Sequence, residues 1–431
     1  MFEYDHCLKI VGGKPLSGTI KASGNKNAVL PILAATLLTK EEVTLTNVPN
    51  IGDVRVMLEV LKELGCTCSF DGSTAKVKAE NITATSISQA MCSRIRTSIL
   101  FVAPILARKG EVSLYPPGGD VIGRRRLDAH FYGLETMGTT IKADGCFSFK
   151  LNQSHFQGKE LFFDEASVTA TEHILTAAVL AKGTTVIRNA ASEPHVQDLA
   201  KILISMGAKI DGLNTNTLTI VGVEELHGTT HEVRGDHIEA GSFLALGAAT
   251  GGAVTVEGIQ KSDFWMINRV FERFNVPLTF KNNSVSIPAN IDLRVQKDFG
   301  GVIPCVDDGP WPQFPSDLMS SIVVMATQAE GTVLFFEKMF ESRLYFVDRL
   351  IAMGSAAIIC DPHRAIISGK SQLHGLELSS PDIRAGMALL TAALCAKGES
   401  TIRNVRVIDR GYSDLDLKLK SLGADITRIK N

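Results

Sequence analysis

The feature that most constrains the fold of this 431-residue chain is an internal repeat with a period of about 70 residues, which occurs six times. Each copy contains an apolar helix, a short turn, a β-rich strand, a second helix that stops at a turn, and a further strand. The period is longer than that of the usual solenoid repeats. It predicts an α/β fold built from six equivalent units.

The two helices of each copy have different patterns. The first helices, which begin near residues 27, 97, 169, 240, 316 and 382, are apolar on nearly all sides, so they should lie in the interior. Glycine ends five of the second helices, and Asn275, which also tolerates the left-handed conformation, ends the one in the fourth copy. The five glycine stops are Leu64–Gly65, Met137–Gly138, Met206–Gly207, Met353–Gly354 and Leu422–Gly423.

Six such units are too many for one compact core, so we expect three units in each of two lobes. The hinges are predicted near residues 22–24 and 233–236. Lobe one then comprises residues 1–23 plus 235–431, and lobe two is a continuous insertion of residues 24–234.

The charge and hydropathy of the chain exclude several classes of protein. A formal net charge of -2 and a pI near 6.6 provide no field suited to a phosphate backbone, so nucleic acid is not an expected partner. Residues 1–6 lack the pattern of a signal peptide, and the longest apolar stretch, 99–107, is far shorter than a membrane span of about 20 residues. A soluble, cytoplasmic protein without membrane partners is expected, and no oligomeric state is assigned.

The eight cysteines are scattered, and the spacing of Cys66 and Cys68 matches no zinc or redox motif. Buried, reduced thiols account for them, and no metal site is predicted.

Polar residues gather at the starts of the apolar helices, where unpaired N–H groups and the positive end of the helix dipole attract anions. Six such starts facing one cleft would form an anion site. For Ser167, Thr169, Ser316 and Glu239, plain N-capping is the role we expect, because such residues at helix starts are usually caps. Lys26, Arg96 and Arg384 need another reason, because a cation opposes the dipole at a helix start. We interpret these three as anion-binding residues.

The segment 115–126 has the composition of a movable lid, with two prolines, three glycines and a run of three arginines. A run of arginines alone is more typical of a solvated surface. Beside Asp120, on a flexible loop, Arg124, Arg125 and Arg126 indicate a functional site instead.

Six motifs together resemble the UDP-N-acetylglucosamine 1-carboxyvinyltransferases of the enolpyruvyl transferase family. The resemblance covers essentially the whole chain. The motifs are Ser23-Gly24-Asn25-Lys26-Asn27-Ala28, Gly118-Gly119-Asp120-Val121-Ile122-Gly123-Arg124-Arg125, Phe314-Pro315-Ser316-Asp317, Phe340-Glu341-Ser342-Arg343, Asp382-Ile383-Arg384-Ala385 and Ile408-Asp409-Arg410-Gly411-Tyr412.

The resemblance implies a two-lobed, inside-out α/β barrel that closes over its substrates and uses no metal or organic cofactor. It implies transfer of the enolpyruvyl group of phosphoenolpyruvate to the 3-hydroxyl of UDP-N-acetylglucosamine, with release of phosphate, as the first committed step of peptidoglycan synthesis. Lys26, Arg125 and Arg410 match the cations that hold phosphoenolpyruvate, and arginine forks suit bidentate oxygen contacts.

The resemblance also assigns roles to individual residues. Asp317 matches the group that takes the hydroxyl proton, and Asp120 stands on the loop that carries the proton donor. Asn27, Asp382 and Arg384 match residues near the reacting centre. Positions that hold the nucleotide sugar are matched by Arg96, Arg126, Leu127, Asp128, Ala129, His130, Ser167, Val168, Met339 and Arg343, while Glu193 and Glu239 are weaker matches.

Several positions depart from the family pattern. Asp120 replaces the usual cysteine, which is the residue that the epoxide antibiotic fosfomycin alkylates, so fosfomycin resistance is expected. Glu165 and His237 stand where basic residues are frequent, Arg126 where proline is frequent, and Ser342 where asparagine is frequent. These departures bear on the acceptor, and Arg124 or Arg126 would restore the charge lost at Glu165.

Two alternatives remain at this point. One is an enolpyruvyl transferase with another acceptor, such as shikimate 3-phosphate. The other is a non-catalytic nucleotide-sugar-binding paralogue. The first conflicts with the Asn25-Lys26-Asn27 and Ser316-Asp317 motifs, and the second with the presence of both Asp120 and Asp317, because binding alone does not require two acid-base carboxylates.

Overall fold

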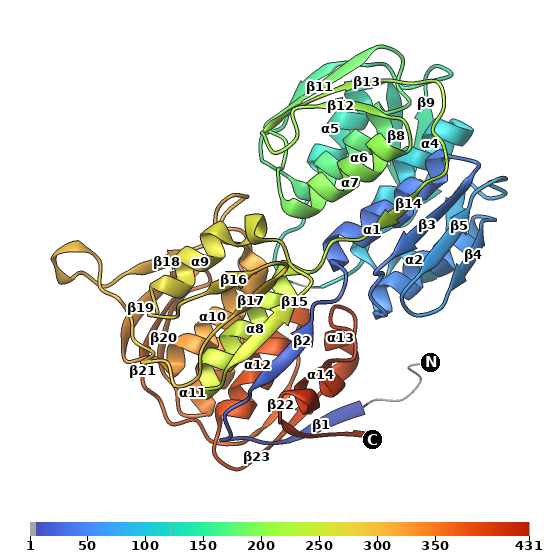
Figure 1. The fold of residues 1–431 in the computed structure, drawn as a ribbon. Helices are drawn as coiled ribbons and strands as arrows, with labels where there is room; N and C mark the ends of the chain where they lie inside the picture. The colour runs from blue at the N-terminus through green and yellow to red at the C-terminus, as the bar shows by residue number, and fades with distance from the viewer. Residues whose placement is uncertain (1–5, 121, 431) are drawn as a thin grey trace. The chain divides into compact units, whose positions relative to one another are not determined.

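The computed structural model describes residues 6–120 and 122–430, and its contacts divide the chain into two units (Figure 1). Unit 1 comprises Met1–Ser23, Val121–Arg124 and Gly235–Asn431, and unit 2 comprises Gly24–Asp120 and Arg125–Arg234. The N-terminal pentapeptide and Val121 of the predicted lid lie outside the described residues.

Each unit contains three four-stranded sheets of identical topology. In every sheet an edge strand runs parallel to its neighbour, and the other two pairings are antiparallel. The six sheets confirm the predicted sixfold repeat.

The sheets of unit 2 are β14 (Thr230–Glu232), β3 (Glu42–Thr46), β5 (Ala75–Lys78) and β4 (Thr67–Phe70); β6 (Ser86–Ile87), β7 (Glu111–Leu114), β9 (Cys146–Leu151) and β8 (Thr139–Asp144); and β10 (Glu160–Phe162), β11 (Thr184–Arg188), β13 (Thr217–Val221) and β12 (Lys209–Asp211). Those of unit 1 are β22 (Glu377–Ser379), β23 (Glu399–Arg403), β1 (His6–Val11) and β24 (Asp425–Lys430); β2 (Gly18–Lys21), β15 (Val254–Glu257), β17 (Ser284–Ser286) and β16 (Thr279–Lys281); and β18 (Cys305–Asp307), β19 (Gly331–Phe336), β21 (Arg364–Gly369) and β20 (Ala356–Asp361).

In each unit the apolar first helices of the repeats lie in the interior, and the sheets lie outside them (Figure 1). In unit 1 the helices α8 (His237–Thr250), α10 (Ser316–Thr327) and α12 (Ile383–Cys395) pack against one another. Residues 383–394 of α12 are all buried, as a helix that is apolar on every side requires. Each unit therefore has its own hydrophobic core, lined by the inward side chains of three sheets.

The corresponding first helices of unit 2 are α1 (Lys26–Ala35), α4 (Val102–Lys109) and α6 (Val168–Ala178). In the second repeat, the helix expected from residue 97 begins instead as the 3-10 helix η2 (Arg96–Phe101), which runs directly into α4. The remaining helical segments of unit 2 are η1 (Thr36–Leu38), α2 (Gly52–Glu63), α3 (Gln89–Cys92), α5 (Asp128–Thr136) and α7 (Pro194–Ser205). Those of unit 1 are η3 (Lys261–Phe264), α9 (Trp265–Glu272), η4 (Phe299–Gly301), α11 (Val347–Ala352), α13 (Val405–Ile408) and α14 (Leu415–Ser421).

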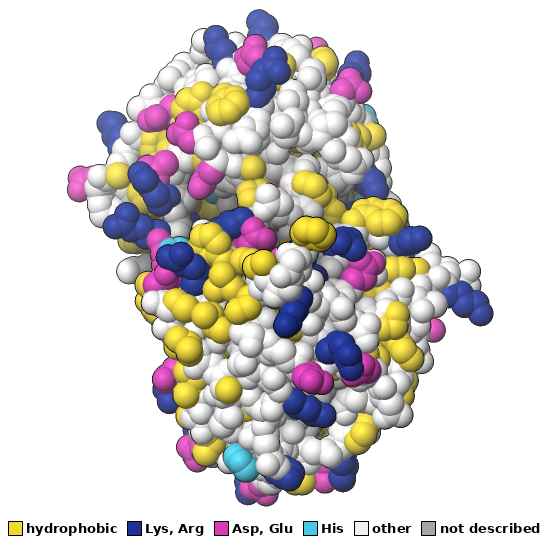
Figure 2. Space-filling model, turned by 90° about the vertical axis from the view of Figure 1, so that its left-hand side faces the viewer, with side chains coloured by type: hydrophobic (Ala, Val, Ile, Leu, Met, Phe, Trp, Pro, Cys, Tyr) yellow, Lys and Arg dark blue, Asp and Glu magenta, His cyan; other side chains and the backbone are white. Residues whose placement is uncertain are grey.

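The predicted helix stops are confirmed by the backbone. All five glycines have φ between 95° and 110°, and Asn275 has φ of 60°, so each ends its helix in the left-handed region. On the face displayed in Figure 2, basic and acidic side chains are interspersed, consistent with the near-neutral net charge.

Candidate active site

A cluster of arginine and carboxylate side chains surrounds the start of α10 in unit 1. Asp317, in the first turn of α10, accepts hydrogen bonds from Arg384 Nε and Nη2 on Oδ2 at 3.0 and 2.8 Å. Its Oδ1 accepts one from Arg343 Nη2 at 3.0 Å. The two arginine side chains are 3% and 6% exposed, whereas that of Asp317 is 25% exposed. The carboxylate is thus held as an anion and is more exposed than the two arginines that bind it.

Local structure places Arg384 beside Asp317. Asp382 is the N-cap of α12, and its Oδ1 accepts hydrogen bonds from the N–H groups of Arg384 and Ala385 at 2.8 and 2.9 Å. The guanidinium group of Arg384 lies over the ring of Tyr412, 5.5 Å from its centroid. Although burial lowers it, the facing carboxylate of Asp317 raises the pKa of Arg384 above its ordinary value.

Three donors of this cluster have no acceptor within residues 6–120 and 122–430. They are the buried nitrogens Nε and Nη1 of Arg343 and Nη1 of Arg384. A buried guanidinium N–H that lacks an acceptor is costly, so these groups favour an anionic or oxygen-rich ligand near Asp317.

Glu337, which directly follows β19, is fully buried and bonds to Ser316, the residue before Asp317. Its oxygens accept from Ser316 Oγ at 2.8 and 2.9 Å, and the Phe340 N–H donates to Oε1 at 3.2 Å. Burial and the neighbouring Asp308 raise the pKa of Glu337 to about 9.

The structure places the other unit 1 candidates on surrounding segments. Met339 lies in the loop after β19, and Arg410 lies in the turn after α13. Ser342 donates its N–H to the carbonyl of Ile122 at 3.2 Å. His237 is buried at the start of α8, with its ring centroid 6.2 Å from that of Trp311.

In unit 2, Lys26 at the start of α1 forms an ion pair with Asp53 in the first turn of α2. The distance from Nζ to Oδ2 is 3.0 Å, and the side chains are 12% and 3% exposed. Asn25 caps α1 by accepting a hydrogen bond from the backbone N–H of Asn27 at 2.8 Å. The side chain of Asn27, which follows Lys26 in the chain, is half-buried. The cation that opposes the helix dipole is therefore offset by a buried carboxylate.

Arg96, the first residue of η2, holds the backbone of residues 125 and 126. Its Nη2 donates to the backbone carbonyl of Arg125, and to that of Arg126 at 3.2 Å. Burial and the nearby charge of Arg125 lower the pKa of Arg96 to about 10.

The glycines before Asp120 allow its segment to lie close to the end of α3 and the start of η2. A Cβ atom on Gly118 would lie 2.0 Å from the carbonyl oxygen of Ser93, and Gly119 has φ of 106°. Asp120 itself is half-buried.

A buried histidine pair connects α5 to α6. The Ala103 N–H donates to Nε2 of His173 at 3.0 Å, so the Nδ1 of His173 carries the proton of a neutral ring. That Nδ1 faces Nδ1 of His130 at 3.0 Å, and Nε2 of His130 faces the hydroxyl of Thr169 at 3.0 Å. Burial lowers the pKa of His173 to about 3, and burial together with His173 and Arg96 holds the pKa of His130 well below its usual range. Both rings are therefore neutral.

The other nucleotide-sugar candidates of unit 2 lie near this pair in the chain. Leu127 precedes α5, and Asp128 and Ala129 form its first turn, while Ser167 and Val168 begin α6. The exposed Arg126 side chain donates to both oxygens of Asp128 at 2.8 and 2.9 Å, and Glu165 contributes a smaller attraction. Arg126 thus has a carboxylate partner besides Glu165.

A second pair of carboxyl groups lies in unit 2. Glu172 on α6 is buried, and burial followed by the charge of Glu193 raises its pKa well above the usual range. Glu193 precedes α7 and is half-buried.

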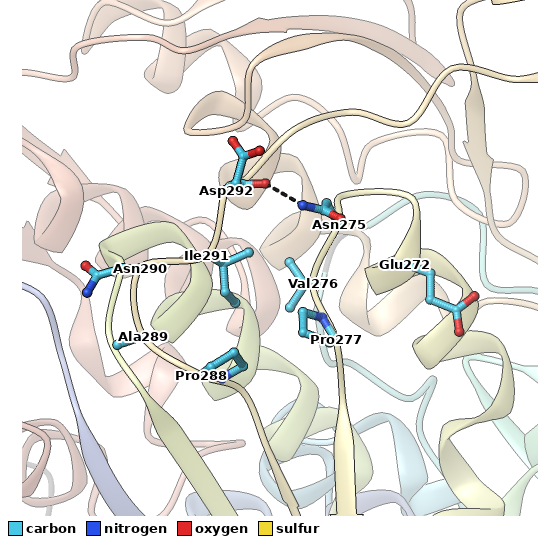
Figure 3. A pocket seen from close by; sticks show the side chains of 9 residues that line it. All are labelled: Glu272, Asn275, Val276, Pro277, Pro288, Ala289, Asn290, Ile291 and Asp292. Carbon is cyan, nitrogen blue, oxygen red and sulfur yellow. Dashed lines mark hydrogen bonds between the residues drawn. The ribbon is translucent and has the colours of Figure 1, made fainter.

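A pocket of about 400 Å³ in unit 1 contains none of these candidates. Figure 3 shows it between the end of α9 and the segment after β17, with Pro277, Pro288 and Ile291 on its walls and Asn275 donating to the carbonyl of Asp292. The charged residues of its lining are the acidic Glu272 and Asp292, which do not suit an anionic substrate. We therefore place the candidate site at the arginine cluster of unit 1 and at Lys26 of unit 2.

A family model described as EPSP synthase (3-phosphoshikimate 1-carboxyvinyltransferase) matches residues 10–419, nearly the whole chain. The chain belongs to the EPSP synthase family. This membership, together with the sheets described above, confirms the predicted inside-out α/β fold.

Among curated members of the EPSP synthase family, proteins named UDP-N-acetylglucosamine 1-carboxyvinyltransferase are similar to the chain over its full length. The one from Borreliella burgdorferi is 50% identical over 99% of this chain and 100% of its own. The one from Treponema denticola is 50% identical over 98% and 99%. The resemblance carried by the six motifs is thereby confirmed.

Solved EPSP synthase-family structures share the fold at lower identity. The enolpyruvyl transferase NikO from Streptomyces tendae superposes with a TM-score of 0.88 at 24% identity, over 99% of this chain and 100% of that one. An EPSP synthase from Acinetobacter baumannii gives a TM-score of 0.75 at 17% identity, over 98% and 100%.

Within this family fold, the capping explanation of four helix-start residues needs correction. Ser316 donates to Glu337 instead of capping α10, and Thr169 faces His130. Glu239 accepts from Lys418 Nζ at 2.6 Å, while Asp236 caps α8. Ser167 occupies the N-cap position of α6 but makes no side-chain capping bond.

Several site-adjacent residues of this EPSP synthase-family chain were not predicted from the sequence. Glu337 had a signal, because it follows the apolar run Leu334-Phe335-Phe336 at a position where alternation points inward. The others were Asp53, Asp308, Glu172, His173 and Lys418, whose roles depend on partners distant in sequence.

Two further observations concern cofactors and membranes. Among the described residues, no three His, Cys, Asp or Glu side chains are grouped to hold a metal ion. No described helix is both long and apolar enough to cross a bilayer.

Proposed function

We propose that this protein transfers the enolpyruvyl group of phosphoenolpyruvate to the 3-hydroxyl of UDP-N-acetylglucosamine and releases phosphate. The observation that carries the proposal is full-length identity of about 50% to proteins named for this activity. The buried arginines around Asp317 support it, because phosphoenolpyruvate brings a phosphate and a carboxylate. In a bacterial cell this reaction commits the sugar nucleotide to peptidoglycan synthesis.

The proposed reaction is an addition followed by an elimination. The oxygen of the sugar 3-hydroxyl bonds to C2 of phosphoenolpyruvate while its proton passes to a base and C3 gains a proton from an acid. Loss of a proton from C3 and of phosphate from C2 then restores the double bond. We assign the base to Asp317, which is ionised beside two guanidinium groups, and the acid to Asp120.

The binding roles are assigned by unit. In unit 2, Lys26 and Arg125 hold the anionic groups of phosphoenolpyruvate, and Arg96 holds the backbone of residues 125 and 126 ahead of α5. The start of α6 and residues 126–130 hold the nucleotide sugar. In unit 1, Arg410 is the third cation for phosphoenolpyruvate. Arg343 and Arg384 hold Asp317 and provide positive charge for the departing phosphate, where preorganised donors are most effective.

The activity is tested by measuring phosphate release from phosphoenolpyruvate with UDP-N-acetylglucosamine or shikimate 3-phosphate as acceptor. We expect release with the sugar nucleotide alone, and its loss in Asp317→Asn. The exposed carboxylate variant Glu377→Gln is the matched control, since Glu377 only pairs with Arg403 at the surface. Release with shikimate 3-phosphate would assign another acceptor, and tight sugar-nucleotide binding without release would indicate a non-catalytic paralogue.

A further inference from the structure

Asp308 and Glu337 form a buried pair of carboxyl groups behind the candidate base. Both residues are 0% exposed. Asp308 Oδ1 accepts a hydrogen bond from the backbone N–H of Lys338 at 2.5 Å. Its other oxygen, Oδ2, is buried and has no hydrogen-bond donor among the described residues. The Glu337 carboxyl is its hydrogen-bonding neighbour. A proton on the Glu337 carboxyl would supply the missing donor, because two ionised carboxylates in contact repel each other strongly in a buried site.

The remaining contacts of Glu337 fit a neutral acid. Ser316 Oγ lies 2.8 Å from Oε1 and 2.9 Å from Oε2, and the Phe340 N–H donates to Oε1 at 3.2 Å. The hydroxyl has a single proton, so when it donates to Oε1, Oε2 can carry the proton of the neutral acid and donate it. Arg343 Nε is 4.0 Å from Oε2 and makes no hydrogen bond to it. Lys338 directs its ammonium group to Asp307, and His363 donates from Nδ1 to the backbone carbonyl of Glu337 at 2.7 Å. Among these facing groups, only Arg343 would be drawn to an ionised Glu337.

The protonation state of Glu337 determines whether Arg343 pairs with Asp317 alone or is also attracted to Glu337. With Glu337 neutral, the charge of Arg343 is directed to Asp317 at 3.0 Å. With Glu337 ionised, a second buried anion would compete for the same guanidinium group. Ser316, held by Glu337, is also the residue before Asp317, so the pair fixes the start of α10 as well.

We propose that Glu337 and Asp308 share one proton and position Asp317 for catalysis, by holding Ser316 and by leaving Arg343 to pair with Asp317. The inference rests on the proposed function in so far as Asp317 is the base of that reaction. Glu337 acts through Ser316 and Arg343 and is a positioning residue.

The test compares four variants of the full-length protein in the phosphate-release assay. Glu337→Gln imitates the protonated acid, so kcat should stay within about threefold of the wild type. Glu337→Ala removes the support of Ser316 and Arg343 and should lower kcat about 100-fold, with KM for UDP-N-acetylglucosamine little changed. In Asp308→Asn the new amide stabilises an ionised Glu337, so the loss of kcat should grow as the pH rises.

The double variant Glu337→Gln/Asp308→Asn contains no charge to misdirect Arg343 and should recover most of the activity lost in Asp308→Asn. Additive loss in the double variant, or Glu337→Gln as inactive as Glu337→Ala, would overturn the inference. Melting temperatures of all four variants identify any that fail to fold. If the double variant is folded, its kcat shows whether the activity lost in Asp308→Asn has been recovered.

A spectroscopic measurement separates this inference from the proposed function. The infrared difference spectrum of wild type minus Glu337→Gln at neutral pH should contain the carbonyl band of a protonated carboxylic acid. Its absence would overturn the shared proton, whatever the protein catalyses. If the band is present but wild type releases no phosphate with UDP-N-acetylglucosamine, the proposed function fails while the shared proton stands.

Discussion

Arg384 donates two hydrogen bonds to a single oxygen of Asp317, from Nε at 3.0 Å and from Nη2 at 2.8 Å. Arg343 occupies the other oxygen. The proposed base is therefore held in one orientation and kept ionised by groups that are themselves buried. To act as the base, this carboxylate must lie within hydrogen-bonding distance of the sugar hydroxyl whose proton it takes.

Replacing Arg384 tests whether it keeps Asp317 ionised and oriented. We expect Arg384→Gln to lower kcat about 100-fold, because a preorganised donor is lost at the reacting centre. The acidic limb of the pH-rate profile should also move to higher pH, since an anion with less positive charge beside it binds protons more readily. Arg403→Gln, at an exposed position that pairs with Glu377, is the control. An unchanged profile in Arg384→Gln would argue against Asp317 as the base.

Lys26 has both a structural partner and a proposed catalytic role. Lys26→Ala should abolish most turnover and also lower the free energy of unfolding by about 1–3 kcal/mol, because the buried Asp53 loses this ion pair. Lys26→Ala/Asp53→Asn should regain stability in urea unfolding without regaining turnover. Recovery of turnover in the double variant would restrict Lys26 to a structural role.

Asp120 offers a test of the loop assignment. A carboxylate is a poorer nucleophile than a thiolate, so the wild-type protein should turn over normally in the presence of fosfomycin. Asp120→Cys should remain active and be inactivated by fosfomycin over time, with the adduct detectable by mass spectrometry. Asp120→Ala should lose about 100- to 10,000-fold in kcat while still binding UDP-N-acetylglucosamine in calorimetry. Covalent labelling of Asp120 in the wild type would contradict this assignment.

The neutral pair His130–His173 makes stability dependent on pH. Both pKa values are lowered in the folded protein, so below about pH 6.5 the unfolded chain binds protons that the folded chain does not. The free energy of unfolding should therefore fall as the pH drops from 7 towards 4.

His173→Gln removes one of these titrating groups. Its free energy of unfolding should depend less on pH than that of the wild type, by up to about 1.4 kcal/mol per pH unit, in urea titrations at pH 7 and pH 5. His155→Gln, at an exposed position, should retain the wild-type dependence. Identical slopes for wild type and His173→Gln would show that His173 is protonated in the folded state.

Much of the architecture followed from patterns that are local in the sequence. The repeat predicted six equivalent units, and the glycine stops predicted left-handed caps, because only glycine and asparagine adopt that conformation at low cost. The placement of Lys26, Arg96 and Arg384 at helix starts was likewise readable, since each opposes the dipole of its own helix or turn.

The partners of those cations were decided only by the tertiary structure. Asp53 lies 27 positions from Lys26, and Asp317 lies 67 positions from Arg384, so no spacing rule connects them. The same holds for Asp308 and Glu337, and for His130 and His173, whose contacts arise from the packing of strands and helices of separate segments. Periodicity determines which face of an element is buried. Which buried polar groups meet, and therefore which of them carry a proton, depends on distances and desolvation that exist only in the folded chain.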